Sequence, residues 1–207
     1  MLNKDELINK VLEAEWKMFQ DVPNIGGKAA CQEDYRTFKI NRVGQAITWS
    51  SAALESYLAD LIEADKNQRN LLTEKYGRMM KSTSPEEYAK IENLLPPLDG
   101  DVTTIIEEII KIILAWEEEL KSKYPDITKR GRPTYSSQDT LRVTSIETYL
   151  RGELPTYSLT TLKLLKEHIL NQQANRINAS EITLEYMMKQ YGFQSLEEAN
   201  NKLKTKL

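Results

Sequence analysis

Four residues in the first quarter of the chain have the types and spacing needed to bind a ligand. On a helix, successive residues at 100° intervals put Glu15 in the middle of the apolar face of the segment from Lys4 to Phe19. A carboxylate there must be paired, protonated or facing a cavity, because burying it alone costs several kcal/mol. Arg42, Gln45 and Trp49 follow on one stripe of the next predicted helix. We therefore predict that these four side chains converge on a pocket between the first two helices.

The predicted pocket suits a small anionic or planar ligand. Arg42 can bind an anionic group through two parallel hydrogen bonds, and Lys28, which follows Gly26-Gly27, adds a second positive charge. Glu15 would then be the catalytic acid or base, or would orient Arg42. The sequence leaves one alternative open, in which Glu15 and Arg42 form a structural ion pair that fixes the register of two helices and performs no chemistry.

The composition of the helix around Arg42 is a second argument for the pocket. No acidic residue occurs between Tyr35 and Ala53, although a surface helix would carry glutamate and lysine throughout. We expect Tyr35, Phe38 and Trp49 to line the wall of the site, where tryptophan can stack on a planar ligand. If this aromatic face is instead flat and exposed, the chain is a helical interaction module without catalytic activity, which binds another protein or a second copy of itself.

The cysteine and histidine contents restrict other chemistry. Cys31 and His168 are the single cysteine and the single histidine, and nothing in the sequence brings them together as a nucleophile and its base. A di-iron bundle or a zinc site needs several such residues, so we predict no metal, and the sequence assigns no cofactor. One cysteine cannot form an internal disulfide, and no apolar run is long enough for a signal peptide or a membrane span. We therefore expect a cytoplasmic protein without a membrane partner.

A basic loop is the one feature that points to nucleic acid. Lys129-Arg130-Gly131-Arg132-Pro133 resembles the core of an AT-hook, in which Arg-Gly-Arg lies in the minor groove. The motif occurs once and its flanks are not basic. The chain has 28 basic and 31 acidic residues and a net charge of -3, which argues against a general polyanion binder. DNA contact is therefore the third and least favoured interpretation.

Helical periodicity and capping residues recur along the whole chain, and no segment alternates with a period of two. Hydrophobic residues make up 40% and charged residues 29% of the 207 positions, which allows a substantial core under a solvated surface. We predict an all-α bundle of about seven or eight helices. It should form a single domain over residues 1–207, with a candidate subdomain boundary in the irregular stretch 124–135.

Three of the expected helices matter most for the candidate site and the core. They run from Lys4 to Phe19, from Gln32 to Lys66 as one long helix, and from Val102 to Lys121. Gly152 and Gly192 stand where helix C-caps are expected.

Several short motifs, spread over nearly the whole chain, resemble one bacterial family. They are Glu15-Trp16-Lys17-Met18-Phe19, Asn24-Ile25-Gly26-Gly27, Cys31-Gln32, the spaced residues Phe38, Arg42, Gln45 and Trp49, Glu55-Ser56-Tyr57-Leu58, Asn70-Leu71-Leu72-Thr73-Glu74-Lys75-Tyr76, Arg130-Gly131-Arg132-Pro133 and Thr148-Tyr149-Leu150-Arg151-Gly152-Glu153-Leu154. Together they resemble the family catalogued as domain of unknown function 4125. The resemblance implies a helical, single-domain protein of the bacterial cytosol and implies no activity. Its motifs include the four residues that helix geometry selects independently.

Overall fold

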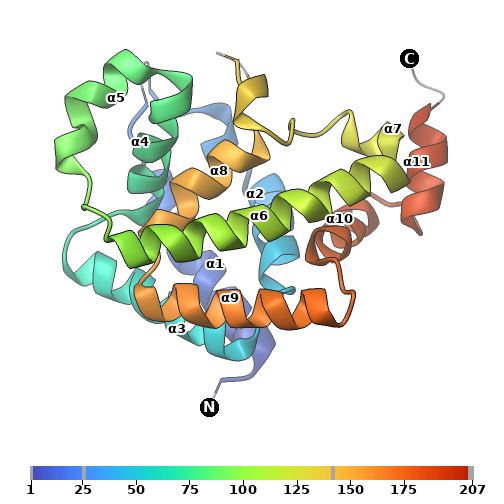
Figure 1. The fold of residues 1–207 in the computed structure, drawn as a ribbon, viewed down its shortest axis with the longest axis horizontal. Helices are drawn as coiled ribbons and strands as arrows, with labels where there is room; N and C mark the ends of the chain where they lie inside the picture. Colours follow the sequence, from blue (N-terminus) through green and yellow to red (C-terminus); the bar gives the residue numbers. More distant parts are fainter. Residues whose placement is uncertain (1, 25–26, 141–142, 205–207) are drawn as a thin grey trace.

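The computed structural model describes residues 2–24, 27–140 and 143–204. Within these ranges the chain forms eleven α-helices and four short 3-10 turns, and no strand (Figure 1). The helices are α1 (Lys4–Gln20), α2 (Tyr35–Ala46), α3 (Ser51–Lys66), α4 (Leu71–Thr83), α5 (Pro85–Ile91), α6 (Gly100–Lys123), α7 (Pro125–Thr128), α8 (Ile146–Glu153), α9 (Leu159–Ala174), α10 (Ala179–Gln190) and α11 (Leu196–Lys204). The all-α prediction is confirmed, whereas the expected number of seven or eight helices was too low.

The long helix predicted from Gln32 to Lys66 is wrong, because the chain breaks it between α2 and α3. The Thr48 hydroxyl donates to the Gln45 carbonyl at 2.7 Å, and the Ser50 hydroxyl accepts from the backbone N–H of Ala53 at 3.2 Å. Local side-chain hydrogen bonds of this kind replace helical backbone bonds, so the first ends α2 and the second caps α3. The break lets α3 leave the direction of α2, which gives each helix a different set of neighbours (Figure 1).

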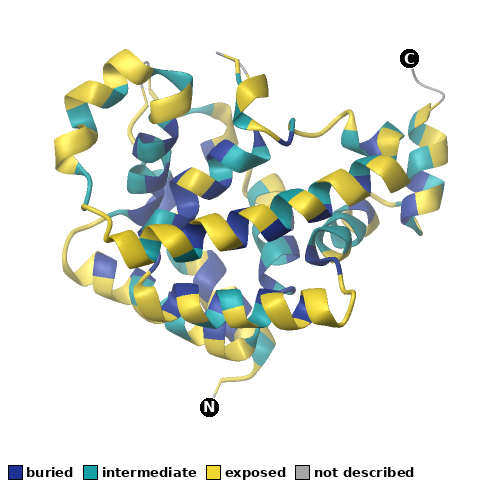
Figure 2. Ribbon diagram, viewed as in Figure 1, coloured by how far each residue is buried: buried dark blue, intermediate teal, exposed yellow. Residues whose placement is uncertain are grey.

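One large core joins the longer helices. α6 crosses the molecule and packs against α8 and α9 (Figures 1 and 2). α4 packs against α8, α3 packs against α9, and α1 packs against both α3 and α4. Leu54 of α3, Ile109 of α6 and Leu162 of α9 are completely buried there. A smaller cluster at the far end of α6 joins α7, α10 and α11 through Ile127, Met188 and Leu196. The concave space between these two clusters is where the candidate site lies.

The two glycines predicted as C-caps differ. Gly192 follows the end of α10 with a φ of 91°, the left-handed conformation that a helix-ending glycine adopts. Gly152 lies inside α8 instead, so its predicted C-cap role is wrong. A Cβ at Gly152 would stand 2.5 Å from Met79 Cγ and 2.7 Å from the Lys75 carbonyl oxygen of α4. The missing side chain therefore lets α4 and α8 pack closely, which brings Lys75 beside Glu153.

Candidate functional site

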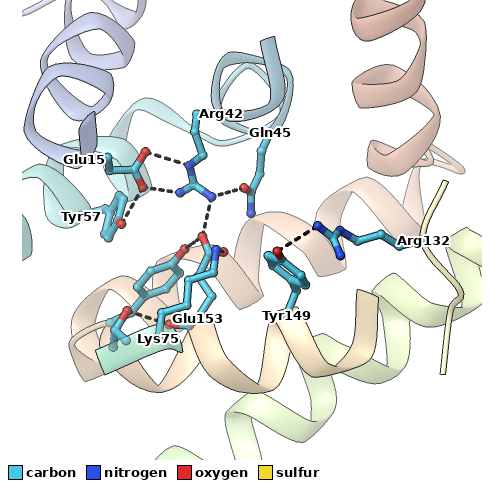
Figure 3. A network of polar contacts seen from close by, with 10 residues as sticks. Glu15, Arg42, Gln45, Tyr57, Lys75, Arg132, Tyr149 and Glu153 are labelled. Carbon is cyan, nitrogen blue, oxygen red and sulfur yellow. Dashed lines mark hydrogen bonds and ion pairs between the residues drawn. The ribbon is translucent and has the colours of Figure 1, made fainter. Parts of the chain in front are cut away.

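The predicted meeting of Glu15 with Arg42 is confirmed. Glu15 of α1 is completely buried, and Arg42 of α2 binds its carboxylate through two guanidinium nitrogens (Figure 3). Arg42 Nε donates to Glu15 Oε2 at 2.8 Å, and Arg42 Nη2 donates to Glu15 Oε1. Tyr57 of α3 donates its hydroxyl to Glu15 Oε1 at 2.8 Å. The buried carboxylate is therefore paired and fully hydrogen-bonded, as its place on an apolar face requires.

A second carboxylate, which the sequence did not reveal as part of the site, completes the network. Arg42 Nη1 donates to Glu153 Oε1 of α8 and to Gln45 Oε1, both at 2.8 Å. Lys75 Nζ of α4 donates to Glu153 Oε2 at 2.5 Å, and the Tyr157 hydroxyl donates to Glu153 Oε1 at 2.6 Å. Carboxylates and cations thus alternate, and two positive charges balance two negative ones (Figure 3).

The electrostatics of the network follow from burial and charge together. Burial alone would raise the pKa of Glu153, but the charges of Arg42 and Lys75 and the hydrogen bonds from Lys75 and Tyr157 hold that pKa well below its ordinary value. Burial lowers the pKa of Lys75, and the nearby Glu153 carboxylate opposes that effect. Burial and the adjacent carboxylates raise the pKa of both Tyr57 and Tyr157, so both phenols stay protonated and donate.

A cleft of about 850 Å³ opens beside this network, between α2, α4, α6, α8 and α10. Small-molecule sites usually enclose roughly 300–1,000 Å³ behind mostly apolar walls with a few polar groups. Arg42, Gln45, Lys75 and Glu153 are the polar lining residues on the side of the network, and Lys121, Arg130, Arg132 and Thr134 are further polar lining residues. The apolar part includes Trp49, Leu72, Ile113, Trp116, Leu120, Leu150, Leu165, Leu184 and Met187.

The space between α1 and α2, where the pocket was predicted, is filled by aromatic side chains. Trp16 of α1 packs against Tyr35 and Phe38 of α2 with ring centroids 5.0 Å apart, and Phe19 stacks on Phe38 at 5.2 Å. Phe19 and Phe38 also reach the cleft lining. Glu15 is not among the described residues that line the cleft, and it lies on the α1 side of Arg42 (Figure 3).

The remaining predicted site residues divide into two groups. Trp49 lines the cleft and packs against Tyr57 and Tyr157, with ring centroids 5.6 and 5.7 Å away. Lys28 is exposed and donates to Gln20 Oε1 at 3.0 Å, and Tyr35 is 41% exposed. Neither Lys28 nor Tyr35 belongs to the cleft lining in the described part of the chain. The structure therefore brings Arg42, Gln45, Trp49 and Phe38 together and leaves Lys28 and Tyr35 outside.

The single cysteine and the single histidine have separate surroundings. Cys31 is exposed at the cleft lining. His168 Nε2 shares a 2.9 Å hydrogen bond with the Thr48 carbonyl, which also accepts from Gln172 at 2.9 Å. Within residues 2–24, 27–140 and 143–204, no three His, Cys, Asp or Glu side chains gather so as to hold a metal ion. The described helices include none that is long and apolar enough to cross a membrane.

The basic loop that resembles an AT-hook contributes to the cleft lining. Arg132 Nη1 donates to the Thr144 carbonyl and Nη2 to the Tyr149 hydroxyl, both at 2.9 Å. Its guanidinium also lies over the Tyr149 ring, 4.1 Å from the centroid (Figure 3). Arg130 Nη2 donates to the Leu203 carbonyl at 2.9 Å. Both arginines are therefore held by neutral groups, and DNA contact through this loop stays an untested prediction.

Glu153 and Lys75 were missed as site residues although both lie in motifs that carry the family resemblance. Lys75 is in the motif from Asn70 to Tyr76, and Glu153 is in the motif from Thr148 to Leu154. Their position in those motifs was a usable indication. The sequence alone did not tell which motif residues face the Arg42 guanidinium.

The chain belongs to the family described as "Protein of unknown function (DUF4125)", whose model matches residues 5–201. This match confirms the resemblance found in the sequence and covers nearly the whole chain. No curated protein and no solved structure matches the chain.

Proposed function

We propose that this protein binds a small organic molecule in the cleft, and that the molecule combines a planar, apolar body with a group that accepts hydrogen bonds or carries negative charge. The observation that carries this proposal is an excess of donors over acceptors at the polar end of the cleft. Each carboxylate oxygen of Glu15 and of Glu153 already accepts at least one hydrogen bond from Arg42, Lys75 or a tyrosine.

Two residues of the cleft lining, Gln45 and Lys75, have N–H groups that do not donate to these carboxylates. Gln45 accepts from Arg42 with its carbonyl oxygen, and its amide nitrogen points away from Arg42 (Figure 3). Lys75 has three N–H bonds, one of which is directed to Glu153, and its ammonium lies 5.1 Å from the centroid of the Tyr149 ring. A ligand that supplies acceptor atoms would give these donors further hydrogen bonds at the polar end of the cleft.

The apolar walls support a planar ligand body. Trp49 and Trp116 are 6% and 7% exposed, and both line the cleft. Ring contacts with such aromatic walls favour a planar, apolar ligand body. The same burial disfavours the alternative of a protein-interaction module, which would need Trp49 in a flat exposed patch.

We propose that Glu15 orients Arg42 and does not exchange protons with the ligand. Both Glu15 oxygens are occupied by Arg42 and Tyr57, and Glu15 lies outside the described cleft lining. A bacterial cytoplasm is the setting we propose, on the basis of the family resemblance and of a single cysteine that cannot form an internal disulfide.

A titration with N-phenyl-1-naphthylamine, an uncharged planar fluorophore, tests the proposal. We expect saturable one-to-one binding, with a rise in probe emission and quenching of the tryptophans in the cleft. Leu184→Phe should weaken binding at least about fivefold, since Leu184 lines the cleft and a larger side chain fills it. Leu170→Phe is the matched control, because Leu170 is 44% exposed on α9 and is not among the described lining residues. Absence of saturable binding, or equal weakening by both variants, would contradict the proposal.

A further inference from the structure

We infer that the negative charge of the ligand is bound by Arg132 and Arg130 at the rim of the cleft, and not by Arg42 at its floor. The ligand class is therefore an organic anion, whose planar body occupies the cleft and whose carboxylate, sulfonate or phosphate group meets the loop before α8. This inference rests on the proposed function and adds to it the place and the sign of the recognised charge.

The positive charge of Arg42 is already paired with two carboxylates. Its guanidinium contacts Glu15 through Nε and Nη2 and Glu153 through Nη1. Lys75, the other cation of the floor, is paired with Glu153. Since two carboxylates already neutralise two cations, an anion placed against Arg42 would meet the field of Glu15 and Glu153 as well.

Arg132 has the opposite environment. Its guanidinium is fixed in three ways, by the Thr144 carbonyl, by the Tyr149 hydroxyl and by stacking on the Tyr149 ring. None of these partners carries a charge, and no carboxylate pairs with Arg132 among the described residues. A guanidinium that is held in place but not neutralised binds an anion at little entropic cost, because few rotamers are lost on binding.

Three further groups make the rim a site rather than a single charge. Arg130 and Thr134 line the same cleft as Arg132. Arg130 donates to the neutral Leu203 carbonyl and, like Arg132, has no carboxylate partner in the part of the chain that the structure describes. Lys121 of α6 also lines the cleft, although Glu118 pairs with it at 3.0 Å.

Thr134 provides independent support. It is completely buried, and its hydroxyl has no hydrogen-bond partner among the described residues. Buried hydroxyls almost always have a partner, so an unpaired one in a cleft lining indicates a missing acceptor or donor. An oxygen of the anionic group would supply it after a small shift of Thr134, because the hydroxyl has no accessible surface in this structure.

Three acidic side chains also line the cleft, namely Asp34, Glu117 and Glu153. Glu153 is neutralised by Arg42 and Lys75. Asp34 caps α2 by accepting from the backbone N–H of Thr37 at 2.9 Å. Among the described residues neither Asp34 nor Glu117 forms an ion pair with Arg130 or Arg132, so neither carboxylate neutralises the arginines of the rim.

Two fluorophores that differ by one charge test this inference. 1-Anilinonaphthalene-8-sulfonate carries a sulfonate on the aromatic body that it shares with uncharged N-phenyl-1-naphthylamine. We expect Arg132→Gln to weaken the sulfonate probe about tenfold and to leave the neutral probe within twofold. Arg176→Gln is the matched control, since Arg176 is exposed and does not line the described cleft, and it should change neither probe.

Two more variants test the rim site independently, in case Arg132→Gln does not fold. Arg130→Gln should weaken binding of the sulfonate probe about threefold and leave binding of the neutral probe within twofold. Thr134→Val should weaken it as well while keeping or raising the melting temperature, because valine removes a hydroxyl that lacks a partner. Circular dichroism and thermal melting confirm that each variant is folded before it is titrated.

The outcomes separate this inference from the proposed function. The rim site alone is overturned if the neutral probe binds saturably and the affinity for the sulfonate probe is the same in the unaltered protein and in the Arg132, Arg130 and Thr134 variants. Failure of both probes to bind the unaltered protein overturns the proposed function. Binding of duplex DNA that weakens in Arg132→Gln, with no effect on the sulfonate probe, overturns the rim site in favour of nucleic-acid contact.

Discussion

The floor and the rim of the cleft both place an arginine near a tyrosine, yet the two arginines have different surroundings. At the floor, Arg42 is bound to two buried carboxylates, Glu15 and Glu153. At the rim, Arg132 is held by the Thr144 carbonyl and by Tyr149, which are neutral. The comparison indicates that an arginine already paired with carboxylates organises the fold, whereas a fixed but unpaired arginine is available to a ligand.

The two regions should also differ in how much they contribute to stability. Removing one member of a buried ion pair leaves an uncompensated charge in a poorly solvated place, which is strongly destabilising. An exposed arginine that contacts neutral groups contributes little. Substitutions at the floor should therefore change the free energy of unfolding, and substitutions at the rim should change binding.

The largest expected effect belongs to Glu153, because it pairs with both Arg42 and Lys75. Glu153→Gln should lower the free energy of unfolding by about 4 kcal/mol, measured by urea denaturation. Adding Lys75→Met should restore much of that loss, since the double variant again balances the remaining charges. A double variant less stable than Glu153→Gln alone would show that Lys75 contributes through packing and not through its charge.

Glu15→Gln should cost about 3 kcal/mol, because it leaves one carboxylate against the two cations of the floor. Glutamine can still accept from Tyr57 and from Arg42, which moderates the loss relative to Glu153. The affinity for N-phenyl-1-naphthylamine, measured by fluorescence under conditions where the variant is folded, should stay within twofold. Binding lost at unchanged stability would instead assign Glu15 a direct role at the ligand.

Acid should weaken the floor selectively. The pKa of Glu153 is lower in the folded protein than its ordinary value of 4.5, so its contribution to stability is complete above that pH and is lost as the pH falls toward the folded pKa. From pH 6 to pH 3.5 this one group should cost about 1.4 kcal/mol by linkage. Urea denaturation at both pH values gives this loss as the difference between the unaltered protein and the Glu153→Gln/Lys75→Met variant. Equal acid sensitivity of the two proteins would contradict the assignment.

The smallest effect on stability should come from Arg132→Gln. It removes two hydrogen bonds to neutral groups and one ring contact at an exposed side chain, so the expected cost is at most about 1 kcal/mol. The melting temperature by circular dichroism should accordingly fall by only a few degrees. A loss as large as that of Glu153→Gln would show that the rim arginine supports the fold in the same way as Arg42.

Part of this arrangement could be predicted from local sequence, because helical periodicity is local. The inward position of Glu15 and the bounds of α1 follow from apolar spacing, and the pairing of Glu15 with Arg42 follows from the need to compensate a buried charge. The wall residue Trp49 was found for the same reason. Its surroundings were not, because the chain breaks between α2 and α3.

The rest depends on contacts that periodicity does not report. Glu153 meets Arg42 across 111 positions of sequence, and the short helix that carries it has few residues from which to infer a buried face. The break at Thr48 and Ser50 comes from side-chain hydrogen bonds that compete with the helix. The cleft therefore lies beside α2 and not in the space between α1 and α2, and α4, α6, α8 and α10 provide its other walls.

The three tryptophans offer the most direct test of the cleft as a binding site. Trp49 and Trp116 line the cleft. Trp16 is not among the described lining residues and packs against Tyr35 and Phe38. In ¹H–¹⁵N spectra the three indole N–H signals can be assigned with single Trp→Phe variants. Titration with N-phenyl-1-naphthylamine should shift the signals of Trp49 and Trp116 with one common dissociation constant and leave that of Trp16 unchanged. A shift of Trp16 alone, or no saturable shift of Trp49 and Trp116, would contradict the account.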